Sequence, residues 1–404
     1  MNAIKLIIDQ LAVSPWKSLF ILLLSLLAGI LEGASVALLV PLLEIIINED
    51  VSNTSKYEYL NYFMEIFKVE LSSASLLVLF CFFITLKSLF SLAAMNYIGK
   101  VIAELTFDMR EKFINGLLHS KWTFINTKKS GELLNAINFE IPKAASVYRY
   151  SCVILATLFQ VTVLFIVLYN FSISTVVGGI ILGLVLFLSL GFYVRSASEQ
   201  SRLQVNIMNS MISKIHEMLN GIKVIKAMNL IKLVHPIILS KASAIKIATQ
   251  KQIVAKHGLT YLREPIVVIF LSLGIYLSLK MQSLSPEILF ASLVLFLRLA
   301  SSIGKLQSDY QVFLVNSHYF LSFKRKLDEF HSNEESLGDG AREVNFEGDI
   351  EYNDVSYSHD ETIILKDSSF KFPSIGFVSI IGASGAGKTT LADMLLKLYE
   401  PNHG

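Results

Sequence analysis

The chain has 404 residues, of which 53% are hydrophobic and only 17% are charged. This composition and a mean hydropathy of +0.55 exclude a wholly soluble protein and predict an integral membrane protein. The net charge is only +2, from 35 basic and 33 acidic side chains, so we expect no nucleic-acid partner.

Cysteine chemistry is not expected to contribute to function. Both cysteines, Cys81 and Cys152, lie inside apolar segments. We expect them to be buried as small hydrophobic residues, and not to form a disulfide, bind a metal or act as nucleophiles.

Six bilayer crossings are predicted, because a helix needs about 20 apolar residues to span a hydrocarbon core of about 30 Å. They lie in Leu19–Leu43, Leu71–Gly99, Tyr150–Val194 (two crossings) and Pro265–Gly304 (two crossings). Tyr150–Val194 contains no charged residue and is too long for one span, so we expect a turn near Asn170–Ser174. The apolar stretch after Trp16 exceeds the length of a signal peptide, so we expect the first helix to remain in the membrane.

The distribution of basic residues predicts the orientation of the chain. Lysine and arginine outnumber acidic residues in Lys100–Arg149 and Arg195–Lys256, whereas Asn48–Glu70 is mainly acidic. We therefore expect both basic segments and both chain ends on the cytoplasmic side of a bacterial cell membrane. Apolar residues recur every three or four positions in Ile207–Ile231, with Gly221 as a breaker, which predicts membrane helices that continue into the cytoplasm. The alternative is a helix lying on anionic lipid.

A change in composition after about Asn316 predicts three regions. Residues 1–315 form a transmembrane domain with two long cytoplasmic helical extensions, residues 316–345 form a linker, and residues 346–404 begin an α/β domain. Strands are expected within Gly348–Ser356, Phe370–Phe372 and Phe377–Ile381.

The last of these expected strands leads into a glycine-rich motif, GASGAGKT, at Gly382–Thr389. The pattern GxxxxGK[ST] between a strand and a helix is typical of a P-loop, whose backbone N–H groups surround phosphate oxygens. Lys388 is expected to reach the β and γ phosphates, and the Thr389 hydroxyl to bind Mg²⁺. The expected phosphate-binding residues are Gly382, Ser384, Gly385, Ala386, Gly387, Lys388, Thr389 and Thr390. The alternative is a glycine-rich turn that binds no nucleotide.

These features together resemble a half-transporter of the ATP-binding cassette (ABC) exporters. Trp122–Glu140 (WTFINTKKSGELLNAINFE) and Leu219–Ala227 (LNGIKVIKA) look like the two cytoplasmic segments of that family, and Gly382–Thr390 looks like its Walker A motif. The implied fold is a membrane all-α six-helix transmembrane domain of the ABC exporter type, followed by a truncated α/β P-loop domain. The resemblance implies ATP and Mg²⁺ as cofactors, and a second half-transporter as partner in a homodimer or heterodimer.

The resemblance also identifies departures from the family pattern. The position of the aromatic residue that stacks on adenine is occupied by His359, with Tyr357 two residues earlier, and we expect the adenine contact at one of them. The glutamine loop, the LSGGQ signature, the Walker B carboxylates and the switch histidine have no counterpart here. We therefore expect the sequence to be a fragment of the complete transporter, without useful ATP hydrolysis of its own.

Three charges inside the predicted crossings are candidates for function, because charge is costly in a bilayer. They are Glu32, Lys87 and Arg298, and Lys305 lies on the same helix face as Arg298. The basic residues suit an anionic head group such as a phosphate or pyrophosphate. The alternative is that Glu32 pairs with Lys87 or Arg298 as an internal strut.

The substrate class expected from the resemblance is amphipathic. The sequence around Leu31–Gly33 and Leu297–Leu299 looks most like that of exporters of lipid-linked oligosaccharides. Peptide or bacteriocin export and lipid export are the alternatives. Membrane lipid is the other expected partner. A membrane protein that binds nucleotide without transport, or a truncated remnant, is the alternative from another class. A channel is disfavoured, because it would leave the P-loop without a role.

Overall fold

The computed structural model describes residues 3–39, 41–42, 45, 72–171, 173–281, 286–335, 348–359 and 362–404. The predicted acidic segment Asn48–Glu70 lies outside the described residues. Two compact units are present. Unit 1 comprises Met1–Arg110 and Leu134–Phe323, and unit 2 comprises Glu111–Leu133 and Lys324–Gly404.

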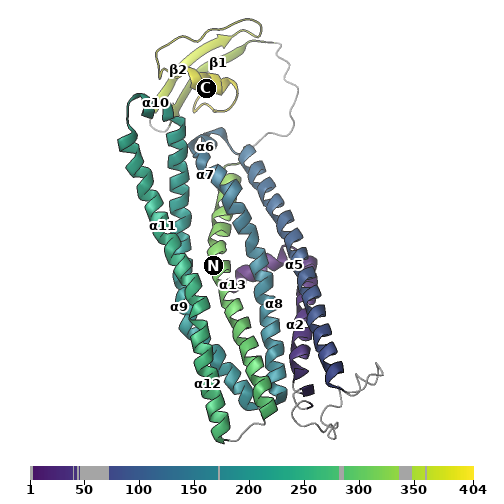
Figure 1. Ribbon diagram of the computed structural model, residues 1–404. Coiled ribbons are helices and arrows are strands. Elements are labelled where there is room, and N and C mark those ends of the chain that lie inside the picture. The colour runs from purple at the N-terminus through teal and green to yellow at the C-terminus, as the bar shows by residue number, and fades with distance from the viewer. Residues whose placement is uncertain are drawn as a thin grey trace. The chain divides into compact units, whose positions relative to one another are not determined.

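Unit 1 is a helical bundle (Figure 1). Its helices are α1 (Ala3–Ala12), α2 (Pro15–Ala37), most of α5 (Ser73–Leu118), part of α7 (Ser130–Asn135), the π-helix η2 (Ala136–Glu140), α8 (Ile141–Phe171), α9 (Ile173–Asn220), α10 (Ile222–Ala227), α11 (Ile231–Tyr261), α12 (Arg263–Met281) and most of α13 (Pro286–Ser332). A core of buried aliphatic residues, including Leu164, Leu182 and Leu295, joins α8, α9 and α13.

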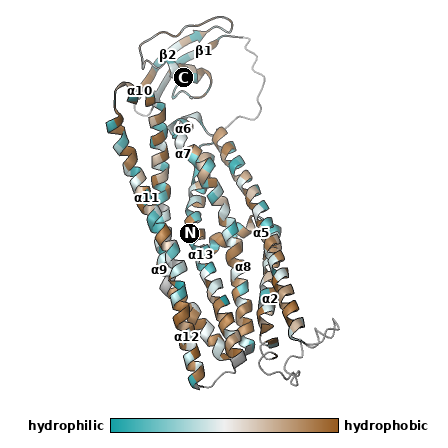
Figure 2. Ribbon diagram, in the orientation of Figure 1, coloured by the Kyte–Doolittle hydropathy of each residue, from teal (hydrophilic) through white to brown (hydrophobic). Residues whose placement is uncertain are grey.

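Five helical segments in the described part of the chain are long and apolar enough to cross a membrane. They are Pro15–Ala37, Ser73–Leu118, Ser130–Asn170, Ile173–Asn220 and Ile288–Ser332. The predicted fifth crossing corresponds to α12, which has 19 residues and is largely apolar in Figure 2 but is not among the five. That crossing stays a prediction.

The predicted turn between the third and fourth crossings is confirmed, because α8 ends at Phe171 and α9 begins at Ile173. Helix α9 has 48 residues and is therefore about 70 Å long, more than twice the thickness of a hydrocarbon core. The predicted break at Gly221 is also confirmed, since α9 ends at Asn220 and α10 begins at Ile222.

A buried carboxylate connects three helices of unit 1, namely η2, α9 and α13. Glu140, at the end of η2, is fully buried. It accepts hydrogen bonds from Asn209 Nδ2 on α9, at 2.9 Å, and from Ser322 Oγ on α13, at 3.1 Å. These polar contacts fix how η2, α9 and α13 pack, because a misplaced helix would leave the carboxylate without donors.

Two glycines bring α2 and α8 close together. Gly29 and Gly33 are four residues apart and so share a face of α2. A Cβ atom at Gly33 would lie 2.5 Å from Val163 Cγ1, and one at Gly29 would lie 3.5 Å from the backbone of Gln160. Small residues at this spacing let helix backbones approach closely in membranes.

The two cysteines differ in their surroundings. Cys152 is buried, as predicted, whereas Cys81 is exposed on α5, so the expectation for Cys81 was wrong. A helix with a lipid-facing side has apolar residues there too, so an apolar segment does not by itself predict burial within the protein.

Unit 2 contains α6 (Trp122–Thr127) and the end of α13, which are held together by aromatic and ionic contacts. The ring of Phe330 packs edge-on against Phe113 and Phe124. Lys128 Nζ lies 2.6 Å from Glu329 Oε2. Helix α13 continues to Ser332, so the first part of the predicted linker is helical. Of the charged residues in this part, Glu329 forms the ion pair with Lys128.

The remaining part of unit 2 has an antiparallel hairpin of β1 (Ile350–His359) and β2 (Thr362–Phe372), followed by α14 (Lys388–Leu395). Leu391 and Met394 are buried on α14, which confirms the helix predicted after the glycine-rich motif. The strand predicted at Phe377–Ile381 is wrong for this structure, because those residues adopt no regular element. A strand requires hydrogen bonds to a neighbouring strand, and none of the strand pairings among the described residues includes Phe377–Ile381.

Gly33→Ala should destabilise unit 1, which we call the membrane unit, because the added methyl group would meet Val163 at 2.5 Å. We expect a loss of about 1–3 kcal/mol, as for other overpacking substitutions. Gly99→Ala on α5 is the matched control, since a Cβ atom added there would have no neighbour within 4 Å among the described residues. It should be neutral or stabilising by up to about 1 kcal/mol. Thermal unfolding of the detergent-purified variants measures both; equal stabilities would contradict the close packing of α2 and α8.

Candidate functional site

The glycine-rich segment lies between β2 and α14 and contains two glycines with a left-handed backbone. Gly385 and Gly387 have φ angles of +83° and +81°, a region that glycine adopts without steric cost. Gly387 caps the start of α14, whose first backbone N–H groups have no acceptor within the helix, as in helix N-termini that bind anions. A Cβ at Gly387 would also lie 2.5 Å from Ile364 Cγ2, so both conformation and space require glycine there.

Lys388 begins α14 and folds its side chain back over the loop. Its Nζ donates hydrogen bonds to the carbonyl oxygens of Gly382, at 2.8 Å, and Ala383, at 2.7 Å. The ammonium group is therefore already held beside the loop. The residues present fit a nucleoside phosphate, because they combine a curled backbone, a helix N-terminus and one lysine. Thr389 is exposed at the start of the same helix, as a ligand of Mg²⁺ would have to be.

The two candidates for the adenine contact occupy the end of β1. Tyr357 is buried in a small core with Val355 and Met394, and its ring packs on Tyr399 at 5.4 Å between centroids. His359 is the last residue of the strand. Tyr357 thus contributes to the packing of the hairpin against the helix. Adenine stacking stays a prediction for both residues.

A second candidate site lies inside the membrane unit, where four helices meet at one carboxylate. Glu32 on α2 is only 3% exposed. Its Oε2 lies 2.9 Å from Lys87 Nζ on α5 and accepts a hydrogen bond from Gln160 Nε2 on α8 at 2.5 Å. Its Oε1 accepts a hydrogen bond from Arg298 Nη1 on α13 at 3.3 Å. We call Glu32, Lys87, Gln160 and Arg298 the Glu32 cluster.

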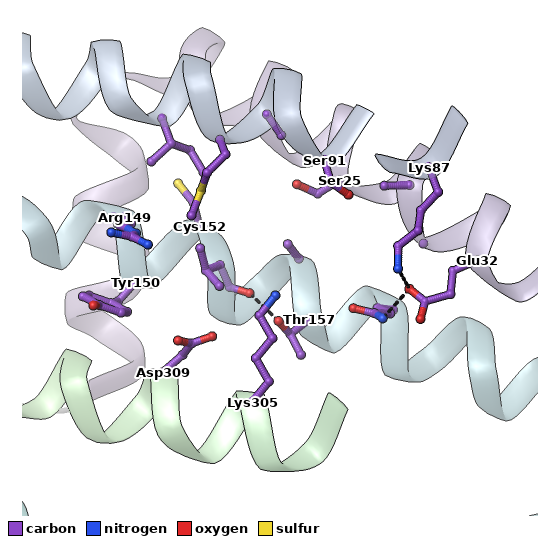
Figure 3. Close-up of a pocket in the computed structure, with 18 residues that line it drawn as sticks. Ser25, Glu32, Lys87, Ser91, Arg149, Tyr150, Cys152, Thr157, Lys305 and Asp309 are labelled. Carbon is purple, nitrogen blue, oxygen red and sulfur yellow. Dashed lines mark hydrogen bonds and ion pairs between the residues drawn. The ribbon is translucent and has the colours of Figure 1, made fainter. Parts of the chain in front are cut away.

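The Glu32 cluster borders a cavity of about 300 Å³ between α2, α5, α8 and α13 (Figure 3). Its lining includes Glu32 and Lys87 together with Arg149, Lys305 and Asp309. In Figure 3, Lys87 points to Glu32 at one end of the cavity, and Arg149, Tyr150 and Asp309 lie toward the other end. Arg298 contacts Glu32 but does not contribute to this lining.

Part of this site is predictable from the sequence. The structure brings the three predicted charges, Glu32, Lys87 and Arg298, into one cluster, and places Lys305 in the cavity as well. Gln160 and Arg149 were not predicted. Gln160 itself had no signal in the sequence, although the Gly29–Gly33 spacing marks the face of α2 that packs closely on another helix.

The architecture and the glycine-rich loop define a class of protein: a helical membrane domain whose chain continues into a P-loop domain. The comparison with known families specifies that class further. The profile of the ABC transporter transmembrane region matches residues 18–303, and the ABC transporter profile, which covers the nucleotide-binding part, matches residues 365–404. The chain belongs to the ABC transporter family.

Curated relatives of the chain include bacterial exporters. It is 23% identical over 358 residues to an ATP-dependent lipid A-core flippase of Mannheimia succiniciproducens, and 24% identical over 350 residues to the same kind of flippase from Haemophilus ducreyi. Each match covers 81% of this chain and 57% of the relative, so the chain spans little more than half the length of these proteins. A shorter match, 35% identical over 88 residues, covers 20% of this chain and 15% of a beta-(1→2)glucan export ATP-binding/permease protein of Agrobacterium vitis.

Proposed function

We propose that the full-length protein is a dimeric exporter that uses ATP to move an anionic amphiphile across the cell membrane. The observation that carries the substrate class is the cavity of the membrane unit, which is lined by three basic side chains and two acidic ones. Lipid-linked oligosaccharides, whose head groups carry phosphate, belong to this class.

The placement of the basic residues supports an anionic substrate. Lys87, Arg149 and Lys305 come from three different helices and line one cavity. Ionisable residues inside a membrane domain are expensive, and they face the bundle interior where they serve a pathway or a partner. An amphiphile with a phosphate group would supply charge-assisted hydrogen bonds to several of these side chains at once.

The names of the relatives agree with this proposal. The flippases act on lipid A-core, and the Agrobacterium protein is named for glucan export. At 23–24% identity the flippase names support the broad class of amphipathic or saccharide-bearing substrates and do not identify one compound.

ATP is the proposed energy source, and the P-loop would hold its phosphates. Lys388 would exchange its hydrogen bonds with the Gly382 and Ala383 carbonyls for phosphate oxygens, and Thr389 would hold Mg²⁺. Mg²⁺ supplies charge neutralisation at the phosphates when bound. By family resemblance, closure of two nucleotide-bound domains would act on the tips near Trp122–Lys129 and Gly221–Leu230, with both termini in the cytoplasm.

Lys388→Ala should abolish ATP-driven transport by the full-length protein and leave its membrane insertion intact, because the phosphates lose their cationic contact. ATP hydrolysis and uptake into inverted vesicles measure the effect. Lys366→Ala, which removes an exposed lysine of β2, is the matched control and should transport normally. Transport that survives Lys388→Ala would refute the P-loop assignment.

Arg298→Ala should weaken substrate-stimulated ATP hydrolysis more than basal hydrolysis, because the arginine belongs to the charge cluster next to the cavity. We expect stimulation by an anionic lipid to fall roughly tenfold, the effect of losing about 1.4 kcal/mol of binding free energy. The comparison of both rates in lipid discs tests this. An equal fall of the two rates would show that Arg298 is only a structural strut.

A further inference from the structure

Glu32 is much less accessible than the two cations that it contacts. Its side chain is 5% exposed, whereas those of Lys87 and Arg298 are 26% and 42% exposed. The two cations therefore offer a ligand more accessible surface than the carboxylate, both of whose oxygens are engaged. Lys87 lines the cavity together with Glu32, and Arg298 contacts Glu32 from outside that lining.

The charges of the Glu32 cluster do not cancel. Two cations, Lys87 and Arg298, face the single carboxylate of Glu32. The cluster therefore retains one positive charge beside an apolar environment, where such a charge favours an anionic ligand. A carboxylate and a phosphate group also bind lysine and arginine in the same way, through short charge-assisted hydrogen bonds.

We propose that Glu32 is a specificity-determining residue, an intramolecular counter-anion that competes with the substrate head group for Lys87 and Arg298. This inference rests on the proposed export of an anionic amphiphile. Only a head group that binds the two cations better than the carboxylate does will engage them. Phosphate monoesters, with up to two negative charges, meet this requirement, whereas zwitterionic and neutral lipids do not.

The geometry also explains why the counter-anion stays in place. Gly29 and Gly33 hold the Glu32 segment of α2 against α8, where Gln160 donates to Oε2. The carboxylate is thus fixed by packing and by a neutral donor that remains when the cations leave. Lys87 and Arg298 have long, flexible side chains that can turn from Glu32 to a ligand without a shift of the helices.

Binding of phosphatidic acid tests the proposal. The full-length protein in phosphatidylcholine discs is titrated with acyl-labelled phosphatidic acid, and with phosphatidylcholine carrying the same label, and fluorescence anisotropy reports the Kd. Glu32→Gln should lower the Kd for phosphatidic acid roughly tenfold, because a competing charge is removed, and leave that for phosphatidylcholine unchanged. Glu32→Asp, whose carboxylate is one methylene further from the cations, should fall between wild type and Glu32→Gln.

A matched control is Glu104→Gln, which removes a carboxylate of α5 that pairs with Lys17 and does not line the cavity. It should bind both lipids like the wild type. Glu32→Asp keeps the charge, so it tests the inference even if Glu32→Gln does not fold. A Kd for phosphatidic acid that is unchanged or higher in the Glu32 variants overturns the inference alone. A wild-type protein that binds both lipids equally overturns the anionic substrate itself.

Discussion

The membrane unit depends on one constraint, the cost of an ionised carboxylate inside a helical bundle. Glu32 is enclosed by α2, α5, α8 and α13, and each of the other three helices supplies a donor to it. A charged side chain at the centre of a membrane helix costs about 2.5–3.5 kcal/mol on insertion scales, so the carboxylate is stable there only with its partners. Whatever alters Lys87 or Arg298 therefore also alters the contact between these helices.

The same dependence links ligand binding to conformation. Under the proposal above, a substrate that took Lys87 and Arg298 from Glu32 would weaken the ionic contacts of α2 with α5 and α13. At the other end of α13, Phe330 and Glu329 hold α6 by ring packing and an ion pair.

Local patterns predicted much of this structure, and long-range pairing accounts for what they missed. The charge-free Tyr150–Val194 segment correctly predicted two helices, because helix formation in a membrane depends on local composition. Phe377–Ile381 has the composition of a strand but is paired with no strand among the described residues. A β-strand forms only when a neighbouring strand supplies its hydrogen bonds, and local composition does not reveal that neighbour. In the same way, three isolated charges predicted a functional cluster or a strut, and only the packing of α2 with α5, α8 and α13 revealed that Glu32 meets both cations and Gln160.

Lipid translocation by the purified protein tests the central claim most directly. Proteoliposomes of the full-length protein are loaded with acyl-labelled phosphatidic acid or phosphatidylcholine, and a membrane-impermeant quencher reports movement between leaflets with and without ATP. The account predicts ATP-dependent translocation of phosphatidic acid only, and its loss in the Lys87→Gln, Arg298→Gln double variant. Translocation of both lipids at equal rates, or a double variant as active as the wild type, would contradict an anion-selective cavity.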